Sequence, residues 1–536
     1  MHSTFISLSV LFPFFAICFA DNPIIQTNYT ADPAPMVYND RVYLFTSHDD
    51  DVTEANFYTM RNYCCYSSND IVNWTDHGIV ASLKEFKWIT VNNGAWAPQC
   101  VARDGKFYLY IPIQGKGIGV QVSDSPTGPF KDPIGKALIN KNGYSDIDPT
   151  VFIDSDGQAY LYWGNGTLWY VKLNKDMVSY TGTIVTVSPK PTGFVEGPWF
   201  YKRNDLYYLA YAGMGSGSEN IQYATSAAPN GPWTSNGIMM PSGNCFTNHP
   251  GICEIEGNSY LFYHTAALPG GGSYKRSVCV DQFTYKSDGT IPSVTASKDG
   301  PAPVRSLNPY DTVQAETICW ASGVRTQACD EGGMNVDSIH NGDYIKVKGV
   351  DFGSGAKSFE ARVASGSSGG TIELRLDSKT GTLAGTCSVA GTGGWQTWAT
   401  KSCDISNLQG VHDLYVKFTG GSGLLFNFNW WKFTSAVGVQ GIEGKELEHG
   451  DAIKATVNAG KTRTLRLDFP EPVSSGYLKI ALFDLNGRQV AILFNGRLSS
   501  RNLTLPMERA GIQNGAYLVR VSLDNDVVLT NTFIWH

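Results

Sequence analysis

Residues 145–164 read SDIDPTVFIDSDGQAYLYWG, an acidic segment around one proline that continues into a strand of alternating aromatic residues. A similar pattern, in which a tyrosine follows the proline by ten or eleven residues, recurs in DPAPMVYNDRVYLF (32–45), APQCVARDGKFYLY (97–110), GPWFYKRNDLYYLAY (197–211) and HPGICEIEGNSYLFY (249–263). The polar turn inside each unit is typical of a β-hairpin. The anchor prolines are Pro33, Pro98, Pro149, Pro198 and Pro250, at intervals of 65, 51, 49 and 52 residues. This period, with units built of short strands, predicts a five-bladed β-propeller over residues 21–300.

The repeat also predicts where the functional residues meet. Asp32, Asp148 and His249 each directly precede an anchor proline, and Glu196 lies two residues before Pro198. Equivalent positions in a closed ring are related by rotation about its axis. We therefore expect these three carboxylates and one histidine to converge in a single funnel, although they are far apart in the chain.

Such a funnel has the groups that glycosidic hydrolysis requires. Three neighbouring carboxylates cannot all ionise freely, because repulsion and partial burial raise the pKa of at least one. Glu196 has the longest reach and lies in the apolar segment FVEGPW, so we assign it as the general acid. Asp32 is then the base that activates water, and Asp148 orients Glu196 and raises its pKa. Any one of these residues alone fits a turn or cap better; the shared repeat position favours catalysis.

Two further polar positions have competing interpretations. His249 fits a hydrogen-bonded core histidine and an axial ligand for water or a cation equally well. The run His48-Asp49-Asp50-Asp51 has the composition of a metal site, but its place directly after a strand favours a solvated loop.

Composition and charge exclude several classes of partner. The chain has 48 acidic and 41 basic residues, a net charge of −7, and no basic cluster, which argues against nucleic acid and anionic membranes. Residues 1–20, MHSTFISLSVLFPFFAICFA, predict a secretory signal peptide, although no Lys or Arg precedes the apolar run. No later run of 18 apolar residues predicts a transmembrane segment. We expect a monomeric protein that is secreted or held at the cell surface.

Ten cysteines follow the predicted signal peptide, six in residues 21–300 and four in residues 312–434. Even numbers within each region of an exported protein favour intradomain disulfides, and Cys319–Cys329 and Cys387–Cys403 are the pairs we expect. Free buried thiols are the alternative. No CxxC pair has the spacing of a structural zinc site.

The rest of the chain predicts two more β-domains. Residues 301–311 form a Pro- and Ser-rich linker, and residues 312–434 contain alternating strands with Gly-rich turns, typical of a β-sandwich of the jelly-roll kind. A second linker over 435–444 leads to residues 445–536, a smaller β-sandwich with the turn signal Asp484-Leu485-Asn486-Gly487. The fold class is therefore all-β throughout.

The motifs of the first domain resemble glycoside hydrolase family 43. They are ADPAPMVYNDRVYLF, YSSNDIVNWTDHG, WAP (96–98), DIDPTVFIDSDG, EGPW and NHPGICEIEGNSYLFYH, in this order. The resemblance implies a five-bladed propeller that cleaves arabinose- and xylose-containing polymers with inversion. Carried over by motif, the base falls on Asp32, the pKa modulator on Asp148 and the acid on Glu196. It further implies His249 on the axis, where some relatives hold calcium, and Arg276 beside the modulator. Trp96, Trp163 and Trp199 become candidate sugar platforms, with packing between blades as the alternative.

Residues 312–434 resemble a family 6 carbohydrate-binding module. The resemblance rests on Gln314-Ala315-Glu316, Asn341-Gly342-Asp343-Tyr344, GGWQTW around Trp395, and FNFNWWKF (426–433). It implies that Glu316 helps to hold a structural calcium ion, and that Trp395 and Asn427, with Tyr344, form the sugar-binding surface. Ser338 stands where a second aromatic residue usually faces the tryptophan, so the usual two-ring cleft is incomplete. Residues 445–536 resemble sorting modules of secreted bacterial polysaccharidases, with a plain β appendage as the alternative.

These features predict a secreted inverting glycosidase that removes α-L-arabinofuranosyl groups from arabinoxylan and needs no cofactor for the chemistry. β-Xylosidase, xylanase and arabinanase activities on the same fold remain open, because loops around the funnel decide between them. A non-catalytic sugar-binding propeller and a structural cell-wall component are more distant alternatives.

Overall fold

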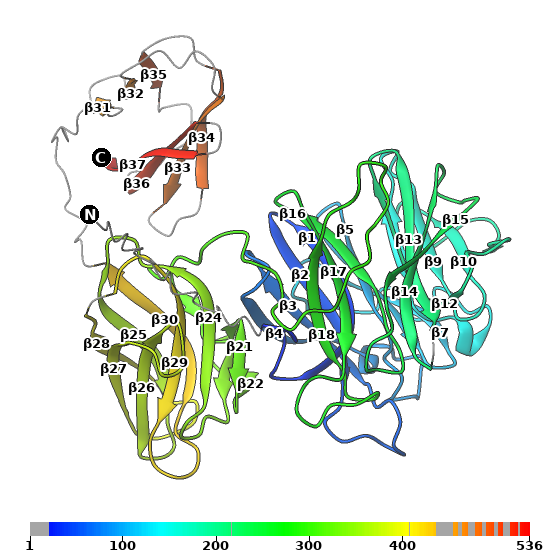
Figure 1. Cartoon of the computed structure of the whole chain (residues 1–536), viewed down its shortest axis with the longest axis horizontal. Coiled ribbons are helices and arrows are strands. Elements are labelled where there is room, and N and C mark those ends of the chain that lie inside the picture. Colours follow the sequence, from blue (N-terminus) through cyan, green and yellow to red (C-terminus); the bar gives the residue numbers. More distant parts are fainter. Residues whose placement is uncertain are drawn as a thin grey trace, which may run out of the picture. The chain divides into compact units, whose positions relative to one another are not determined.

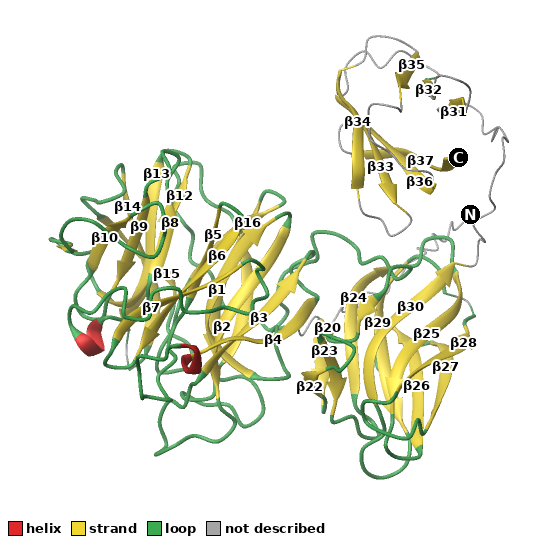
Figure 2. Cartoon of the chain, turned by 180° about the vertical axis from the view of Figure 1, so that it is seen from behind, coloured by secondary structure: helices red, strands yellow, loops and turns green. Residues whose placement is uncertain are grey.

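The computed structural model describes residues 21–215, 217–406 and 408–435, and the stretches 454–458, 464–469, 477–484, 489–497, 502–506, 515–523 and 526–535. The chain divides into two compact units, Met1–Thr434 and Ser435–His536. The predicted signal peptide, residues 1–20, and residues 436–444 of the second predicted linker lie outside the described residues. The described elements are strands apart from two short 3₁₀ helices, η1 (Leu83–Glu85) and η2 (Gly143–Ser145) (Figure 2).

Residues 29–283 form five antiparallel sheets that follow one another along the chain (Figure 1). The strands of the first two sheets are β1 (Tyr29–Tyr38), β2 (Arg41–Asp49), β3 (Asn62–Ser68) and β4 (Trp74–Ser82), then β5 (Gln99–Arg103), β6 (Lys106–Ile113) and β7 (Gly117–Ser123). Those of the third and fourth are β8 (Thr150–Ile153), β9 (Ala159–Trp163), β10 (Trp169–Leu173) and β11 (Val185–Thr186), then β12 (Phe194–Arg203), β13 (Leu206–Met214), β14 (Glu219–Ser226) and β15 (Thr234–Met240). The fifth sheet contains β16 (Gly251–Ile255), β17 (Asn258–Thr265) and β18 (Ser277–Phe283).

The sequence repeat corresponds to the first hairpin of each sheet. Each anchor proline lies in, or directly before, the first strand of a sheet, and each paired tyrosine lies on the second strand. Two-residue turns join these strands where Asn39 and Asp40 (φ 50° and 57°), or Glu256 and Gly257 (φ 50° and 73°), adopt the left-handed conformation. Such turns match the right-handed twist of paired strands and fix their register.

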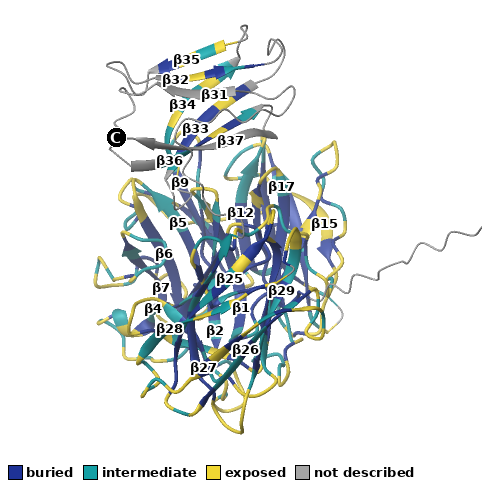
Figure 3. Cartoon of the chain, turned by 90° about the vertical axis from the view of Figure 1, so that its left-hand side faces the viewer, coloured by how far each residue is buried: buried dark blue, intermediate teal, exposed yellow. Residues whose placement is uncertain are grey.

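The first and fifth sheets are neighbours. The Thr30 amide donates to the Arg276 carbonyl at 2.9 Å, the Ile24 amide donates to the Val278 carbonyl at 2.9 Å, and β1 packs against β16, β17 and β18. Gly251 has room for no side chain here, since a Cβ atom would lie 2.3 Å from the Pro33 carbonyl oxygen. The interior of the sheets is buried throughout, as Figure 3 shows by its dark strands.

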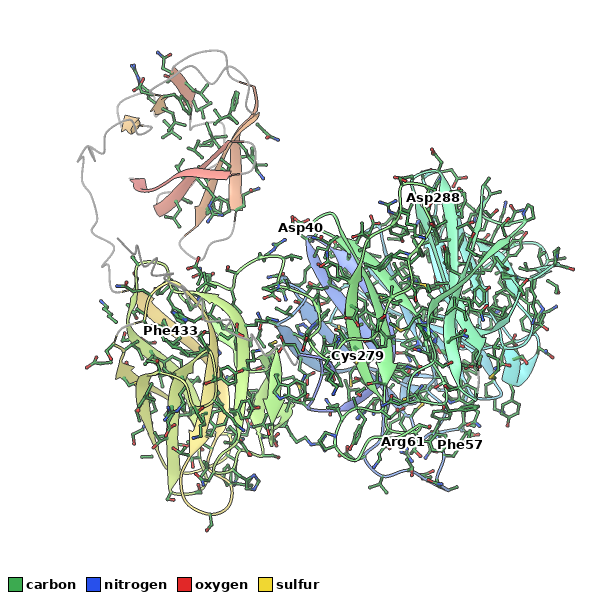
Figure 4. The ribbon with its side chains drawn as sticks, viewed as in Figure 1. Asp40, Phe57, Arg61, Cys279, Asp288 and Phe433 are labelled. Carbon is green, nitrogen blue, oxygen red and sulfur yellow. The ribbon has the colours of Figure 1, made fainter. Side chains whose placement is uncertain are left out.

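Residues 313–435 form the predicted β-sandwich. One sheet has the order β22-β23-β30-β25-β28, with β19 beside β30, and the other the order β21-β24-β29-β26-β27. The strands of the first are β19 (Val313–Gln314), β22 (Arg325–Ala328), β23 (Met334–Asp337), β25 (Ala356–Ala364), β28 (Trp398–Asp404) and β30 (Asn427–Ser435). Those of the second are β21 (Trp320–Ser322), β24 (Tyr344–Asp351), β26 (Gly369–Leu376), β27 (Leu383–Ala390) and β29 (Val411–Thr419). Phe433, labelled in Figure 4, and Trp431 belong to the shared core.

The sandwich is joined to the first sheets by more than a linker. Strand β20 (Thr317–Ile318) pairs with β4 and extends the first sheet. The predicted linker 301–311 is itself packed, because the Val304 amide donates to the Asp70 carbonyl at 3.1 Å and the Leu307 amide donates to the Gly349 carbonyl at 2.9 Å. The buried Asp21 carboxylate accepts from the Lys346 and Lys348 ammonium groups at 2.8 and 2.5 Å.

The second unit also has two antiparallel sheets. One contains β31 (Lys454–Asn458), β32 (Thr464–Asp468) and β35 (Asn502–Pro506); the other contains β33 (Tyr477–Asp484), β34 (Gln489–Arg497), β36 (Gly515–Leu523) and β37 (Asp526–Trp535). Leu465 and Leu467 of the first sheet share a buried core with Ile480 and Val519 of the second. This is the small β-sandwich expected from the sequence.

The expected disulfides are not found. The ten described cysteines, Cys64 to Cys403, are all free thiols, and nine of them are buried. Cys387 and Cys403 are in side-chain hydrogen-bond contact across neighbouring strands. The alternative of free buried thiols therefore describes this structure.

Candidate active site

The three predicted carboxylates meet in one cavity of about 240 Å³. Asp32 lies in β1, Asp148 lies two residues before β8 and Glu196 lies in β12, so the first, third and fourth sheets each contribute one. The ladder is interrupted after Ala31 in β1, and on both sides of Glu196 in β12. A bulge redirects side chains out of the regular alternation, which allows these carboxylates to point into the cavity. The predicted convergence is therefore present.

Asp32 is held in an unusual backbone conformation by buried partners. Its φ is 50°, and its amide donates to Nδ1 of His264 at 3.3 Å, while Nε2 of His264 lies 2.9 Å from the Thr247 carbonyl oxygen. A neutral histidine with its proton on Nε2 satisfies both contacts. Burial lowers the pKa of His264 to about 3, which agrees with that neutral form. Sequence reasoning missed His264, which lies on the second strand of its sheet, away from any anchor proline.

The Asp32 carboxylate is kept ionised by its neighbours. Its Oδ1 accepts from Nη1 of Arg276 at 2.9 Å, and its Oδ2 accepts from the Ser47 hydroxyl at 2.7 Å. Burial alone would raise the pKa of Asp32, but the Arg276 guanidinium, with smaller contributions from His264, His249 and the Ser47 hydroxyl, lowers it by more, and the pKa falls below its ordinary value. An ionised, buried carboxylate is suited to take a proton from water.

Arg276 is placed differently from the prediction. It lines the cavity, but its ion pairs are with Asp32 and Asp49 and not with the modulator Asp148. Asp49 is fully buried and accepts from Nε and Nη2 of Arg276, at 2.9 Å each. The prediction that the run His48–Asp51 is a solvated loop is therefore wrong for Asp49, whose buried carboxylate fixes the guanidinium that faces Asp32. The Arg276 guanidinium also lies 4.8 Å from the centre of the Tyr58 ring.

Asp148 and Glu196 have the opposite electrostatics to Asp32. Burial, with repulsion from Glu196 and Asp32, raises the pKa of Asp148 well above its ordinary value. Burial and the Asp32 charge raise the pKa of Glu196 to about 7. Oδ2 of Asp148 accepts from the Gly197 amide at 2.8 Å and so contacts the backbone directly after Glu196. Asn165, at the cavity wall, donates to the Glu196 carboxylate. The site therefore combines one carboxyl group whose pKa is lowered with two whose pKa values are raised.

A fourth carboxyl group, Glu219, was not predicted. It is the first residue of β14, only 3% exposed, and its side chain is in hydrogen-bond contact with Glu196. Burial and the Glu196 charge raise the pKa of Glu219 to about 9. It lies on the third strand of its sheet, where the repeat gives no signal, and only its spacing after the paired tyrosine at 208 could have drawn attention to it.

His249 reaches the cavity as predicted, beside Gly197, where an added Cβ atom would lie 3.1 Å from its Nδ1. Burial lowers the pKa of His249 to about 4, so the ring is neutral at neutral pH. Among the described residues no group of three or more His, Cys, Asp or Glu side chains gathers to hold a metal ion.

Only one of the three predicted tryptophan platforms is at the site. Trp96 is half-buried and lines the cavity. Trp163 is fully buried, with Nε1 donating to Asp146 at 2.9 Å, and Trp199 is buried, with Nε1 donating to the Ile252 carbonyl at 3.1 Å. Both are therefore packing residues, and the platform prediction is wrong for them.

The aromatic surface at the mouth comes from loops instead. Phe57, labelled in Figure 4, Tyr144 and Phe246 line the cavity and are 47%, 68% and 52% exposed. Tyr58 contacts the rings of Phe57 and Tyr274, with ring centres 5.0 and 4.7 Å away. These loops carry no repeat pattern, which is why the sequence did not single them out.

In the sandwich, the predicted binding residues divide into two groups. Trp395 is 37% exposed, and the buried Asn427 side chain donates to its carbonyl oxygen at 2.7 Å. Tyr344 lies on β24 of the other sheet, against the Tyr415 ring at 5.8 Å. Contacts among the described residues join Asn427 to Trp395 but do not join Tyr344 to either. Ser338 has a φ of 56° and offers no ring, as its sequence position indicated.

Glu316, the predicted calcium ligand, is buried next to Asp76. Burial and the Asp76 charge raise the pKa of Glu316 well above its ordinary value. Its Oε2 atom has no hydrogen-bond partner within the described part of the chain. A buried carboxylate oxygen without a partner is costly, and such an oxygen fits a cation ligand.

One ionised and one protonated carboxyl group facing a single cavity form the arrangement that a glycosidase needs. The chain matches the model for glycosyl hydrolases family 43 over residues 20–291 and that for carbohydrate binding module (family 6) over residues 314–435. It belongs to glycosyl hydrolases family 43 and carries a family 6 carbohydrate-binding module. No helix in the described part of the chain is long and apolar enough to cross a membrane.

The similarity to individual relatives extends across both modules. The chain is 36% identical to the arabinoxylan arabinofuranohydrolase of Paenibacillus polymyxa, over 82% of this chain and 78% of that protein. It is also 36% identical to the arabinoxylan arabinofuranohydrolase of Bacillus subtilis (strain 168), over 77% of this chain and 92% of that protein. A crystal structure of a family 43 arabinoxylan arabinofuranohydrolase from Bacillus subtilis, in complex with cellotetraose, matches with a TM-score of 0.70 and 35% identity. That match covers 77% of this chain and 97% of the other.

Proposed function

We propose that the protein is an inverting arabinoxylan arabinofuranohydrolase, which removes α-L-arabinofuranosyl groups from the xylan chain. The observation that carries the proposal is the shared cavity of Asp32, Asp148 and Glu196, with Asp32 ionised and Glu196 able to hold a proton. The relatives named for this activity align with the catalytic and the carbohydrate-binding modules together, and this supports arabinoxylan over other substrates.

In the proposed reaction Glu196 and Asp32 act on opposite sides of the arabinose ring. Glu196 gives its proton to the oxygen that links arabinose to xylan, as the bond from this oxygen to the anomeric carbon breaks. Water attacks the anomeric carbon from the other side and gives its proton to Asp32. Inversion in one step needs room for this water, so the two carboxyl groups are expected about 6.5–9.5 Å apart.

Arg276 and Asp148 support these roles. Arg276 keeps the pKa of Asp32 low enough for a base, because its charge offsets the cost of burying the carboxylate. Asp148 accepts a hydrogen bond from the Gly197 amide and so fixes the backbone directly after the proposed acid, Glu196. Burial and repulsion from Glu196 and Asp32 raise the pKa of Asp148, which disfavours a second negative charge beside the proposed base.

The test is the stereochemistry and identity of the product. We expect arabinose from wheat arabinoxylan, released as the β-anomer and detected by NMR before mutarotation. Glu196→Gln should lower kcat/KM on arabinoxylan by about 10²–10⁴-fold with unchanged circular dichroism, because the leaving oxygen loses its proton donor. Glu85→Gln, at an exposed ion pair with Lys131, is the matched control. Release of xylose or of arabino-oligosaccharides would favour the xylosidase or arabinanase alternatives, and full activity of Glu196→Gln would favour a non-catalytic propeller.

Several features stand as proposals of the same kind. The contacts of β1 with the fifth sheet support a closed five-bladed propeller. The apolar leader supports export, and the chain is proposed to act as a monomer. In the binding module, Glu316 would hold a structural calcium ion, which would neutralise its buried carboxylate. Residues 445–536 are proposed to serve sorting or attachment, and Trp395 with Asn427 to bind the xylan chain.

A further inference from the structure

Glu219 occupies a position behind the proposed acid. It begins β14, two strands from β12 in the same sheet, with β13 between them. Its amide donates to the Phe246 carbonyl at 3.0 Å, which ties the start of β14 to the loop before β16. The residue is 3% exposed and is not among the described residues that line the cavity, whereas Glu196 is. Substrate in the cavity therefore meets Glu196 and not Glu219.

The contacts of the Glu219 carboxyl group require a proton. Oε2 accepts from the Asn248 amide at 2.9 Å, and the carboxyl group also forms a hydrogen bond with the Glu196 side chain. Two carboxylates have only acceptors, so they can bond to each other only when one of them carries a proton. At least one member of the pair therefore carries a proton.

The surroundings decide which member holds this proton. Glu196 is half-buried and receives a hydrogen bond from Asn165, which favours its ionised form. The charged and titratable groups that act on Glu219 are Glu196 in β12, Asp32 in β1, Asp148 before β8 and Arg276 directly before β18, and its burial is nearly complete. Burial and the carboxylate charges raise the pKa of Glu219 to about 9 and that of Glu196 to about 7. Below pH 9, Glu219 is therefore the protonated member whenever Glu196 is ionised.

We propose that Glu219 is a positioning residue of the acid: its protonated carboxyl group donates a hydrogen bond to Glu196 and holds the Glu196 side chain toward the leaving oxygen. After Glu196 has given up its proton, this hydrogen bond stabilises the carboxylate that remains. The bond is strongest at that stage because a hydrogen bond to an ionised acceptor is stronger than one between neutral groups. No proton leaves Glu219 in the reaction. This inference rests on the proposed role of Glu196.

The experiment compares Glu219→Gln with Glu219→Met. Glutamine keeps a donor for Glu196 and an acceptor for the Asn248 amide, whereas methionine has a similar length and offers neither. Each variant is assayed on arabinoxylan and on an aryl α-L-arabinofuranoside, whose phenolate leaves with little help from an acid. The pH profile of kcat/KM reports the pKa of Glu196 in the free enzyme through its basic limb.

We expect Glu219→Gln to stay within about threefold of the native kcat on both substrates, since the donor is retained. Glu219→Met should lower kcat on arabinoxylan by about 10–100-fold with little change in KM, and on the aryl substrate by much less, because only the acid step is affected. Its basic limb should move to higher pH, because loss of the donor raises the pKa of Glu196. If Glu219 had a purely structural role, Glu219→Met would lower kcat equally on both substrates and would leave the basic limb of the pH profile in place.

The proposal is overturned if Glu219→Met leaves unchanged both the basic limb of kcat/KM and the ratio of kcat on the two substrates. It is also overturned if Glu219→Gln loses as much activity as Glu219→Met while circular dichroism shows that both variants are folded. Glu196→Gln, assayed in parallel, separates this failure from that of the proposed function. If Glu196→Gln loses arabinoxylan activity and Glu219→Met does not, Glu196 remains the acid and Glu219 has no positioning role. If neither loses activity, the assignment of Glu196 itself is wrong.

Discussion

Arg276 is the residue on which the charge state of the site depends most directly. Its guanidinium has hydrogen bonds to Asp32 on one side and Asp49 on the other, and all three side chains are buried. In such a network each charge is tolerated only because of the others, since an isolated buried charge costs several kcal/mol. Arg276 thus sets both the local stability and the pKa of the proposed base.

Arg276→Met should affect activity and stability together. Without the cation, burial raises the pKa of Asp32, so the acid limb of kcat/KM should move up by about 1–3 pH units. The free energy of unfolding should fall by about 3–5 kcal/mol, because Asp49 and Asp32 remain buried without their partner. Adding Asp49→Asn should restore part of the lost stability, but it should not return the acid limb of kcat/KM to its native pH. Arg305→Met, at an exposed ion pair with Glu256, should change neither quantity. An unmoved acid limb in the folded variant would contradict the role given to Arg276.

The residues that could be found from the sequence share one property. Asp32, Asp148 and His249 stand beside an anchor proline, where each hairpin begins, and rotation of the repeat brings such positions to one axis. His264, Asp49 and Glu219 lie on second and third strands, where side chains toward the cavity differ from sheet to sheet. Their roles come from pairing across sheets, and a single sequence contains no record of which strands become neighbours.

At the scale of elements, the sequence predicted hairpins well and loops poorly. A two-residue polar turn between alternating runs fixes strand register locally, so the hairpins at Asn39-Asp40 and Glu256-Gly257 follow from a few residues. The rim aromatics Phe57, Tyr144 and Phe246 lie on long connections whose path depends on the rest of the fold. The platform prediction failed for Trp163 and Trp199 because their burial depends on how the sheets pack together, which the sequence of one strand does not show.

The close approach of β16 to β1 provides a test at this scale. Gly251→Ala places a Cβ atom 2.3 Å from the Pro33 carbonyl oxygen, next to Asp32. We expect the shift of β1 to cost about 1–3 kcal/mol in the free energy of unfolding, measured with urea, and to lower kcat/KM. Gly243→Ala, which meets no atom within 4 Å, is the control for loss of a glycine. Equal stability of both variants would show that β1 and β16 are not held as closely as described.

For the molecule as a whole, the raised pKa values of the site predict that stability falls above neutral pH. Glu196 and Glu219, with pKa values of about 7 and about 9, hold protons in the folded chain that the unfolded chain has released above about pH 4.5. Stability therefore falls as pH rises toward these values. His249 and His264 act in the other direction below pH 6.5, because the unfolded chain binds protons that the folded chain does not.

Between pH 6.5 and 8 the carboxyl groups contribute most, with a slope of up to about 1.4 kcal/mol per pH unit for each proton, because the buried thiols, whose pKa values burial raises, add to the decrease only as the unfolded thiols ionise near pH 8.5. We expect the Tm to decrease steadily over this range. Glu219→Gln should flatten most of the decrease, because it removes the group with the higher pKa. Glu360→Gln, at an ion pair with Lys432 in the sandwich, should leave the slope unchanged. A Tm that is flat from pH 6.5 to 9 in the native protein would contradict the protonated state of Glu219.

The junction between the first five sheets and the sandwich argues that residues 21–434 unfold together. Asp21 lies 2.8 Å from Nζ of Lys346 and 2.5 Å from Nζ of Lys348, and all three side chains are buried. Asp21→Ala leaves two buried ammonium groups without this carboxylate, which should cost about 3–5 kcal/mol. Because the lost contacts join the two modules, calorimetry should show the single transition of residues 21–434 separating into two. Asp124→Ala removes an exposed ion pair with Lys106 and should cost about 0–1 kcal/mol without separation. Two transitions in the native protein, unchanged by Asp21→Ala, would instead mean that the modules fold independently and that β20 and the Asp21 contacts add little to either.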